Sequence, residues 1–433
     1  MKKILLKKNV LAWCLYDFAN SAFAVIVLAG FFPIIFKSFW NSDVDPVNVT
    51  ARLGMGNTIS GIIIALLSPV IGAFSDVCKN KKKFLILFMI GGIFCTFFLF
   101  FIEKGMWLFA LALFITANIC FSCGNLFYDS LLVDIAEKKE MDVISSAGFA
   151  FGYLGGGVLL LITFIFTAKY YLFGFSIQIK AMLLSFPFVS VWWVIFSLPL
   201  FVFVKEKSID YKLKPFLVIK QGFIRLFKTC SDLIKDKTVL VFLIAYWFYM
   251  DGVYTFISMS VDFGLSLGFK PIIMLIALLI VQFVAFPSSL LIGYASNFWG
   301  TIKTILFLIG IYFFVCVIGS FLLKTPKDFI ILSCFIAFAQ GGIQALSRSF
   351  YAKIISKENA SEYFGILNII GKFSVILGPF LVGMSAIVAK KFVPASQLAS
   401  RISMASISII FIMGALFLYL TQKSIIKKNI KNL

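Results

Sequence analysis

Twelve apolar segments follow one another along this chain, separated by short loops that carry charges, proline or glycine. A helix needs about 20 mostly apolar residues to cross the hydrocarbon core of a bilayer, and each of these segments is that long or longer. The sequence therefore predicts an all-α polytopic membrane protein with twelve transmembrane helices. Their expected limits are 10–36, 54–77, 84–102, 106–135, 145–168, 181–204, 238–262, 271–293, 302–322, 328–352, 362–388 and 403–422.

The composition supports the same interpretation. Of 433 residues, 61% are apolar and 13% are charged, whereas a soluble protein carries roughly 25% charged residues. The twelve segments account for most of the chain, so little is left for a soluble domain.

The basic residues indicate how the chain is oriented. The sequence has 39 Lys and Arg against 19 Asp and Glu, a formal charge of +20, which by itself is compatible with nucleic-acid binding. With a cytoplasmic N-terminus, however, 26 of these basic residues fall in inner segments and 11 in outer ones, the asymmetry that orients membrane proteins. We therefore expect both termini to be cytoplasmic and no nucleic-acid partner.

The residue types exclude several kinds of chemistry. The chain contains no histidine, which excludes catalytic triads with a His base, His-ligated metals and imidazole proton shuttles. Its eight cysteines are scattered. Cys120 and Cys123 form a C-x-x-C pair, but the pair lies inside a predicted span without further ligands, and we interpret it as two packing residues. No cofactor and no metal are expected.

The longest loop, 205–237, lies at the midpoint and divides the chain into 1–204 and 238–433, each with six predicted spans. Within this loop, apolar residues recur at helical spacing behind Pro215, with charged residues between them. This pattern favours an amphipathic helix on the inner membrane surface, although a basic linker without structure is the alternative. The apolar residues are Phe216, Ile219, Phe223, Leu226, Cys230 and Leu233.

The two halves resemble each other in sequence. A tryptophan precedes an aspartate by four positions at Asp17 and again at Asp251, in the first and seventh spans. Gly72-x3-Asp76 follows the second span, and Gly293-x3-Asn297 follows the eighth. Matches in the same order along both halves predict a duplicated six-helix unit.

Ionisable residues inside predicted spans are the strongest functional signal. Each costs roughly 2.5–3.5 kcal/mol at the centre of a membrane helix, so such a residue indicates a transport pathway by default. Five lie away from the ends of the spans: Asp17, Asp129, Asp251, Arg348 and Lys372.

Amides and hydroxyls extend this polar set. In the fourth span Asn118, Ser122, Asn125 and Asp129 share one helical face. Stripes of this kind face other helices or a wet cavity, because lipid would leave them unsatisfied. The alternative is that these side chains only form structural hydrogen bonds between helices. The further residues that we assign to a substrate or ion pathway are Asn20, Ser21, Tyr254, Gln340 and Gln344.

Several motifs resemble a known family. The loop with Gly72, Asp76, Lys79 and Lys82 resembles the signature loop of the major facilitator superfamily, with departures at Val77 and Asn80. The run W-C-L-Y-D-F-A-N-S-A-F-A at 13–24 is similar to the first helix of the "unknown major facilitator" family, bacterial relatives of the autophagy-related vacuolar amino-acid effluxers. Further matching runs are 127–132, 152–156, 192–193, 251–255, 340–349, 362–365, 371–373 and 378–379.

The resemblance implies a major facilitator fold in which two six-helix lobes carry a small solute by alternating access. It also implies that the first, fourth, seventh and tenth helices line the cavity and that the loop at Gly72 and Asp76 takes part in the conformational change. It suggests the inner membrane of a bacterium and makes amino acids the leading substrate class. Besides the solute, we expect a proton and the lipid bilayer as partners. We expect the protein to be a monomer.

Three alternatives to a proton-coupled transporter remain at this point. The first is an uncoupled facilitator or exchanger of another small metabolite. The second is a polytopic membrane enzyme, but its ionisable groups would cluster at one membrane face, whereas here they are distributed over both halves. The third is a sensor or scaffold, which would need an output domain.

Overall fold

The computed structural model describes residues 5–206, 215–374, 376–392 and 396–431. Among these residues, twelve helices are long and apolar enough to cross a membrane, which confirms the predicted number of spans. They are Lys8–Trp40, Asn48–Cys78, Lys81–Phe101, Trp107–Ile135, Met141–Ala168, Gln178–Phe203, Lys237–Ser260, Ile276–Trp299, Thr301–Leu322, Pro326–Ile354, Lys357–Ala389 and Arg401–Lys427.

The chain forms two compact units, which do not follow the midpoint of the sequence. The first comprises Met1–Ala136, Phe151–Leu226 and Lys357–Asn368, and the second comprises Glu137–Ala150, Phe227–Ser356 and Ile369–Leu433. A short segment of each sequence half is therefore built into the unit formed mainly by the other half. The division into lobes at 1–204 and 238–433 stays a prediction.

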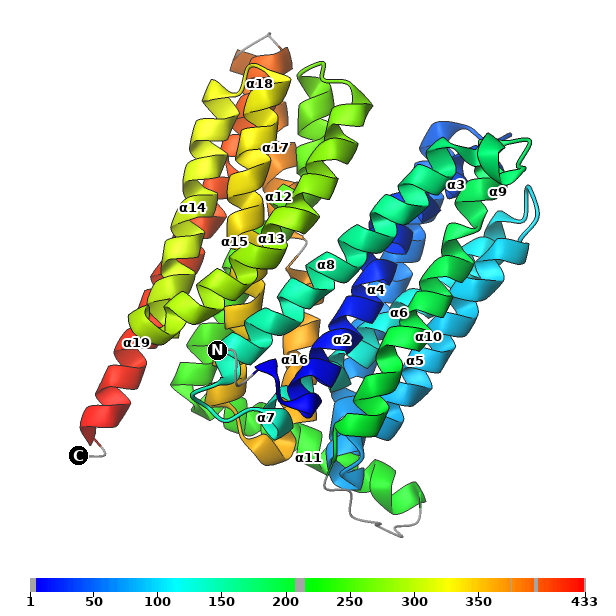
Figure 1. The fold of residues 1–433 in the computed structure, drawn as a ribbon. Helices are drawn as coiled ribbons and strands as arrows, with labels where there is room; N and C mark the ends of the chain where they lie inside the picture. The colour runs from blue at the N-terminus through cyan, green and yellow to red at the C-terminus, as the bar shows by residue number, and fades with distance from the viewer. Residues whose placement is uncertain (1–4, 207–214, 375, 393–395, 432–433) are drawn as a thin grey trace. The chain divides into compact units, whose positions relative to one another are not determined.

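The first unit is a helical bundle in which α2 packs against α10, and α5 and α4 pack against α6 (Figure 1). Its α-helices are α2 (Lys8–Ala22), α3 (Phe32–Ile35), α4 (Pro46–Cys78), α5 (Lys81–Phe98), α6 (Trp107–Ser130), α7 (Leu132–Ile135), α9 (Gln178–Leu183), α10 (Ser185–Phe203), most of α8 (Met141–Ala168), and the first parts of α11 (Pro215–Lys235) and α16 (Ala360–Phe373).

In the second unit, α12 packs against α19, and α13 against α15. The unit contains the first ten residues of α8 and the final parts of α11 and α16. Its complete helices are α12 (Lys237–Ser266), α13 (Pro271–Trp299), α14 (Thr301–Leu322), α15 (Pro326–Ile354), α17 (Leu377–Phe392), α18 (Ser396–Ala405) and α19 (Ile407–Lys431).

Local sequence signals explain several helix ends. Pro326 occupies the first turn of α15, where its missing N–H costs nothing. A capping box precedes it, because the Asp328 carboxylate accepts the N–H of Thr325 at 2.8 Å while the Thr325 hydroxyl accepts the N–H of Asp328 at 3.3 Å. Gly300 joins α13 to α14 with φ +84°, a conformation that favours glycine.

Two spans are less regular than the apolar pattern predicts. The first continues beyond α2 through a π-helical stretch, Phe23–Phe31, and a second one at Phe36–Trp40. The eleventh is divided into α16 and α17, which Figure 1 draws as separate helices. π-Helical turns are frequently found at functional sites, and here the first one directly follows Asn20 and Ser21 on α2.

Candidate functional site

Asp17 is the centre of a polar cluster in the first unit. Its side chain is buried, and it accepts the hydroxyl of Ser21 at 3.1 Å and the hydroxyl of Tyr128 at 3.2 Å. Tyr128 also stacks on Trp13, with ring centroids 4.4 Å apart. Glycine at position 152 on α8 leaves room for this carboxylate, since a Cβ there would lie 3.0 Å from Asp17 Oδ1. Asp17 thus lies among α2, α6 and α8.

The predicted amides extend the cluster along α6. Asn20 is buried and donates its Nδ2 to Asn125 Oδ1 at 2.5 Å. Nearer the other end of α6, Asn118 donates to the hydroxyl of Ser60 at 2.9 Å. Asp129 is half-buried and, like Asp17, interacts electrostatically with the hydroxyl of Tyr16. The first unit therefore brings Asp17, Asn20, Ser21, Asn125 and Asp129 together.

Asp251 is fully buried in the second unit, and its carboxylate holds the start of α17. It accepts the N–H of Leu377 at 2.9 Å, the N–H of Gly378 at 2.8 Å and the hydroxyl of Thr255 at 3.1 Å. A carboxylate at a helix N-terminus satisfies free N–H groups and is favoured by the helix dipole. Asp251 therefore stabilises the break that divides the eleventh span.

The two aspartates occupy equivalent chemical settings. Each has a hydroxyl residue four positions later as a donor, Ser21 or Thr255, and each faces a glycine, Gly152 or Gly378, from the fifth span of its own half. One difference between the two settings lies in the backbone. The Asp251 carboxylate takes two backbone N–H groups, because α17 begins beside it, whereas α8 runs continuously past Asp17.

Arg348 is buried in the second unit, where it anchors the first part of α8. Its Nε donates to the Ser145 hydroxyl at 2.9 Å and its Nη2 to the Ser145 carbonyl at 2.8 Å, and the guanidinium lies 4.3 Å from the ring centre of Phe149. These contacts give Arg348 a structural role in the described state. The other predicted residues of this unit are half-buried: Tyr254, Gln340, Gln344 and Lys372.

The loop with Gly72 and Asp76 meets the start of α16 inside the first unit. Asp76 Oδ2 accepts the N–H of Glu362 at 2.9 Å, and a Cβ on Gly72 would come within 2.4 Å of the Ser361 carbonyl oxygen. Only glycine allows this close approach. Lys79 is exposed and adopts φ +48° just after α4.

Lys82 contacts the end of α10. Its ammonium donates to the carbonyl oxygens of Phe201 at 2.9 Å and Val204 at 2.6 Å, and so stabilises the C-terminal end of α10. Glu206 accepts the N–H groups of Lys81 and Lys82 at the start of α5, and burial raises the pKa of this carboxyl.

The sequence analysis did not identify two buried ion pairs, Glu362–Arg225 and Asp142–Lys353. Glu362 is fully buried and pairs with Arg225 of α11, whose Nε lies 3.1 Å from Glu362 Oε1. In the second unit Asp142 pairs with Lys353 at 2.6 Å and accepts the hydroxyls of three residues, Ser296, Thr301 and Ser349.

The scarcity of arginine is a sequence signal that points to charged residues with structural contacts. Only four of the 39 basic residues are Arg, and a guanidinium offers several donors in a plane that an ammonium cannot replace. All four are engaged with multiple groups: Arg52, Arg225, Arg348 and Arg401.

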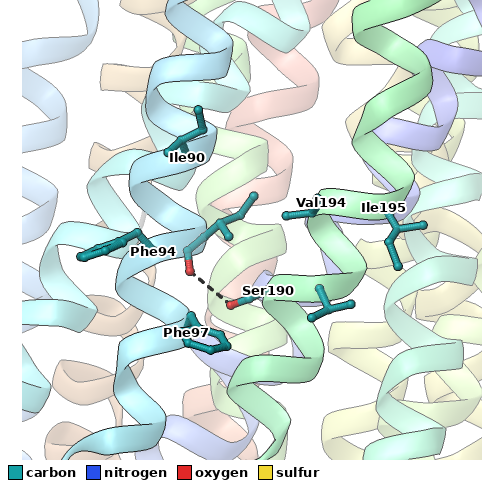
Figure 2. Close-up of a pocket in the computed structure, with 8 residues that line it drawn as sticks. Ile90, Phe94, Phe97, Ser190, Val194 and Ile195 are labelled. Atoms are coloured by element: carbon teal, nitrogen blue, oxygen red, sulfur yellow. Dashed lines mark hydrogen bonds between the residues drawn. The ribbon is translucent and has the colours of Figure 1, made fainter.

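A groove of about 390 Å³ lies between α5 and α10 in the first unit (Figure 2). Ser190 is the one polar residue of its lining, and its hydroxyl is bonded to the carbonyls of Ile93 and Phe186. The groove contains none of the predicted site residues and offers nothing that would hold a polar solute. Its lining residues are Ile90, Ile93, Phe94, Phe97, Ser190, Val191, Val194 and Ile195.

Known proteins resemble this chain over nearly its whole length. The family model described as "Vacuole effluxer Atg22 like" matches residues 42–142 and 133–428. The uncharacterized MFS-type transporter YxiO of Bacillus subtilis is 38% identical over 425 residues, covering 96% of this chain and 95% of that protein. Autophagy-related protein 22 of Saccharomyces cerevisiae (strain ATCC 204508 / S288c) is 22% identical, with coverage of 87% and 86%.

Solved structures confirm the fold. The proton:xylose symporter XylE, bound to 6-bromo-6-deoxy-D-glucose, superposes with a TM-score of 0.73 at 12% identity, covering 95% of this chain and 94% of its own. FucP in the outward conformation gives a TM-score of 0.66, also at 12% identity, with coverage of 96% and 99%. The protein is an integral, multi-pass membrane transporter and not an enzyme, and it belongs to the Atg22-like family of the major facilitator superfamily.

Proposed function

We propose that this protein is a secondary active transporter that moves an amino acid or a similar small polar metabolite by alternating access, coupled to protons through Asp17. The observation that carries the proposal is the cluster around Asp17. It combines a buried carboxylate with the amides of Asn20 and Asn125 and the hydroxyls of Ser21 and Tyr128. We propose the cell membrane of a bacterium as its location, with cytoplasmic termini.

The partners of the two buried aspartates favour Asp17 over Asp251 as the proton carrier. A hydroxyl can rotate to donate to a carboxylate or to accept from a carboxylic acid, so Ser21 and Tyr128 can follow a change of protonation at Asp17. A backbone N–H can only donate. Protonating Asp251 would weaken the hydrogen bonds from Leu377 and Gly378, and we therefore assign Asp251 to holding α17.

The same cluster supports a solute that carries an amino group. Two carboxylates, Asp17 and Asp129, interact electrostatically with the Tyr16 hydroxyl, and charge-assisted hydrogen bonds from an ammonium group to carboxylates are among the strong ones.

A ligand screen tests the substrate class. Purified protein in detergent is heated with each of the twenty amino acids and a panel of sugars, organic acids and amines, and unfolding is followed by tryptophan fluorescence. Because a ligand stabilises the state that binds it, by about 2.7 kcal/mol at 100 times its Kd, at least one amino acid is expected to raise the melting temperature.

Two variants make the screen specific to the site. Asn20→Ala is expected to abolish the shift, whereas Thr116→Ala, an exposed position on α6 bonded to the Ala112 carbonyl, should retain it. A shift with sugars or organic acids and none with amino acids would contradict the proposed substrate class.

A further inference from the structure

The two long faces of α11 have different surroundings. Gly222, Thr229 and Leu233 are buried, and a Cβ on Gly222 would clash with the ring of Phe74 at 2.2 Å. At 100° per residue these positions share one face of the helix. Arg225 lies at the edge of that face. This side of α11 therefore packs against protein.

Arg225, at the edge of the packed face, pairs with Glu362, which lies at the contact between the Asp76 loop and α16. Its Nε pairs with Glu362, its Nη2 donates to Asn359 Oδ1, and its Nη1 lies 3.5 Å from the Asp76 carbonyl oxygen. Glu362 is fully buried, and breaking a buried pair leaves an uncompensated charge. Arg225 thus links α11 to the buried carboxylate of Glu362.

The opposite face of α11 is apolar and uncovered. Ile224, Phe227 and Ile234 are 58%, 75% and 67% exposed. With Ser231 they follow the spacing i, i+3, i+7 and i+10, which is one stripe of a helix. Large apolar side chains at this spacing indicate a surface that something covers.

The charges beside the stripe favour a lipid surface as that cover. Lys228 and Lys235 are exposed and flank the stripe on one side, the arrangement of helices that lie in the interface of a bilayer. Asp232, also exposed, lies nearer the packed face. In addition, α11 ends at Lys235 and the span of α12 begins at Lys237, so the helix ends where the chain enters the membrane.

We propose that α11 binds the anionic phospholipid surface of the cytoplasmic leaflet through Ile224, Phe227 and Ile234 with Lys228 and Lys235, and that this binding holds Arg225 on Glu362. The helix then links lipid composition to the contact between the Asp76 loop and α16. Anionic lipid tightens this contact, and a neutral membrane loosens it.

Amide hydrogen exchange on the full chain tests the proposal. The protein is placed at one copy per nanodisc, in phosphatidylcholine alone or with a quarter of phosphatidylglycerol. Lysines near an anionic surface are attracted to it, so the anionic lipid should slow exchange in 222–235 on the order of tenfold. A smaller slowing is expected in Ala360–Asn368.

Four variants identify the face that is responsible. Phe227→Ser with Ile234→Ser, and Lys228→Gln with Lys235→Gln, should each remove the lipid effect in both segments. Lys138→Gln with Lys139→Gln, exposed lysines of another cytoplasmic loop, should leave it unchanged. Arg225→Lys should keep the lipid effect in α11 but lose it in Ala360–Asn368, because an ammonium cannot make all the contacts of the guanidinium with Glu362, Asn359 and the Asp76 carbonyl.

Two results would overturn the proposal. Equal exchange of 222–235 in both lipids, with the wild-type chain, would exclude recognition of anionic lipid. Slow exchange that appears only with two copies per disc, whatever the lipid, would show that a second copy of the chain covers the stripe instead.

Discussion

Asp251→Asn is expected to lower the stability of the protein far more than Asp17→Asn, although both substitutions remove one buried charge. Asp251 accepts two backbone N–H groups and one hydroxyl. An asparagine has only one acceptor oxygen, and its amide would point a donor at another donor. A buried donor left without a partner costs about 1–3 kcal/mol, so we expect a loss of about 2–4 kcal/mol.

The measurement is the melting temperature of both variants in the same detergent, followed by the fluorescence of the seven tryptophans. Asp17→Asn should stay within about 1 kcal/mol of the wild type, since the hydroxyls of Ser21 and Tyr128 can reorient around an amide. Equal losses in the two variants would contradict the structural role assigned to Asp251.

Of the glycine-to-alanine substitutions in the first unit, Gly155→Ala is expected to lower the stability most. The new Cβ would lie 2.1 Å from the Phe18 carbonyl oxygen, so α8 would have to move away from α2 and from the Asp17 cluster. Overpacking of this kind costs about 1–3 kcal/mol and occasionally more. Because the obstacle is backbone, side-chain rotation cannot relieve it.

Gly61→Ala is the matched control, because a Cβ at this position on α4 has no neighbour within 4 Å. Alanine there should be neutral or should gain up to about 1 kcal/mol in helix propensity. The melting temperatures of the two variants, measured side by side, should differ by several degrees. A melting temperature of Gly155→Ala equal to that of the wild type would contradict the close packing of α8 against α2.

The sequence predicted the twelve spans because crossing a bilayer is a local requirement that a count of apolar residues captures. It also predicted the helix that begins at Pro215, from residues at helical spacing. Its position on the membrane surface stays a prediction.

The break in the eleventh span was not predicted. Glycines at 371, 378 and 383 permit both bending and close packing of helices. Asp251, 126 positions before Leu377, accepts the N–H groups at the start of α17, and a pairing over that distance leaves no trace in local hydropathy.

The charged partners were missed for the same reason. Glu362 and Arg225 are far apart in the sequence: Glu362 stands at the start of a predicted span and Arg225 in the predicted amphipathic helix, where a single charge is common. Asp142 and Lys353 lie near predicted span ends, where charges are common. The intramembrane aspartates could be singled out because burial in lipid makes a charge costly wherever it occurs, but the sequence could not show that Asp251 meets N–H groups and Asp17 meets hydroxyls.

Uptake into proteoliposomes under a pH gradient tests the central claim most directly. The solute found by the ligand screen is supplied outside, with or without an imposed gradient, and counterflow is measured in parallel. The wild type should accumulate solute only with the gradient. Asp17→Asn should lose accumulation while retaining counterflow, because Asp129 and the amides of Asn20 and Asn125 remain to bind the solute. Accumulation by Asp17→Asn at the wild-type level would contradict the role of Asp17, and wild-type uptake that ignores the gradient would identify an uncoupled facilitator or exchanger.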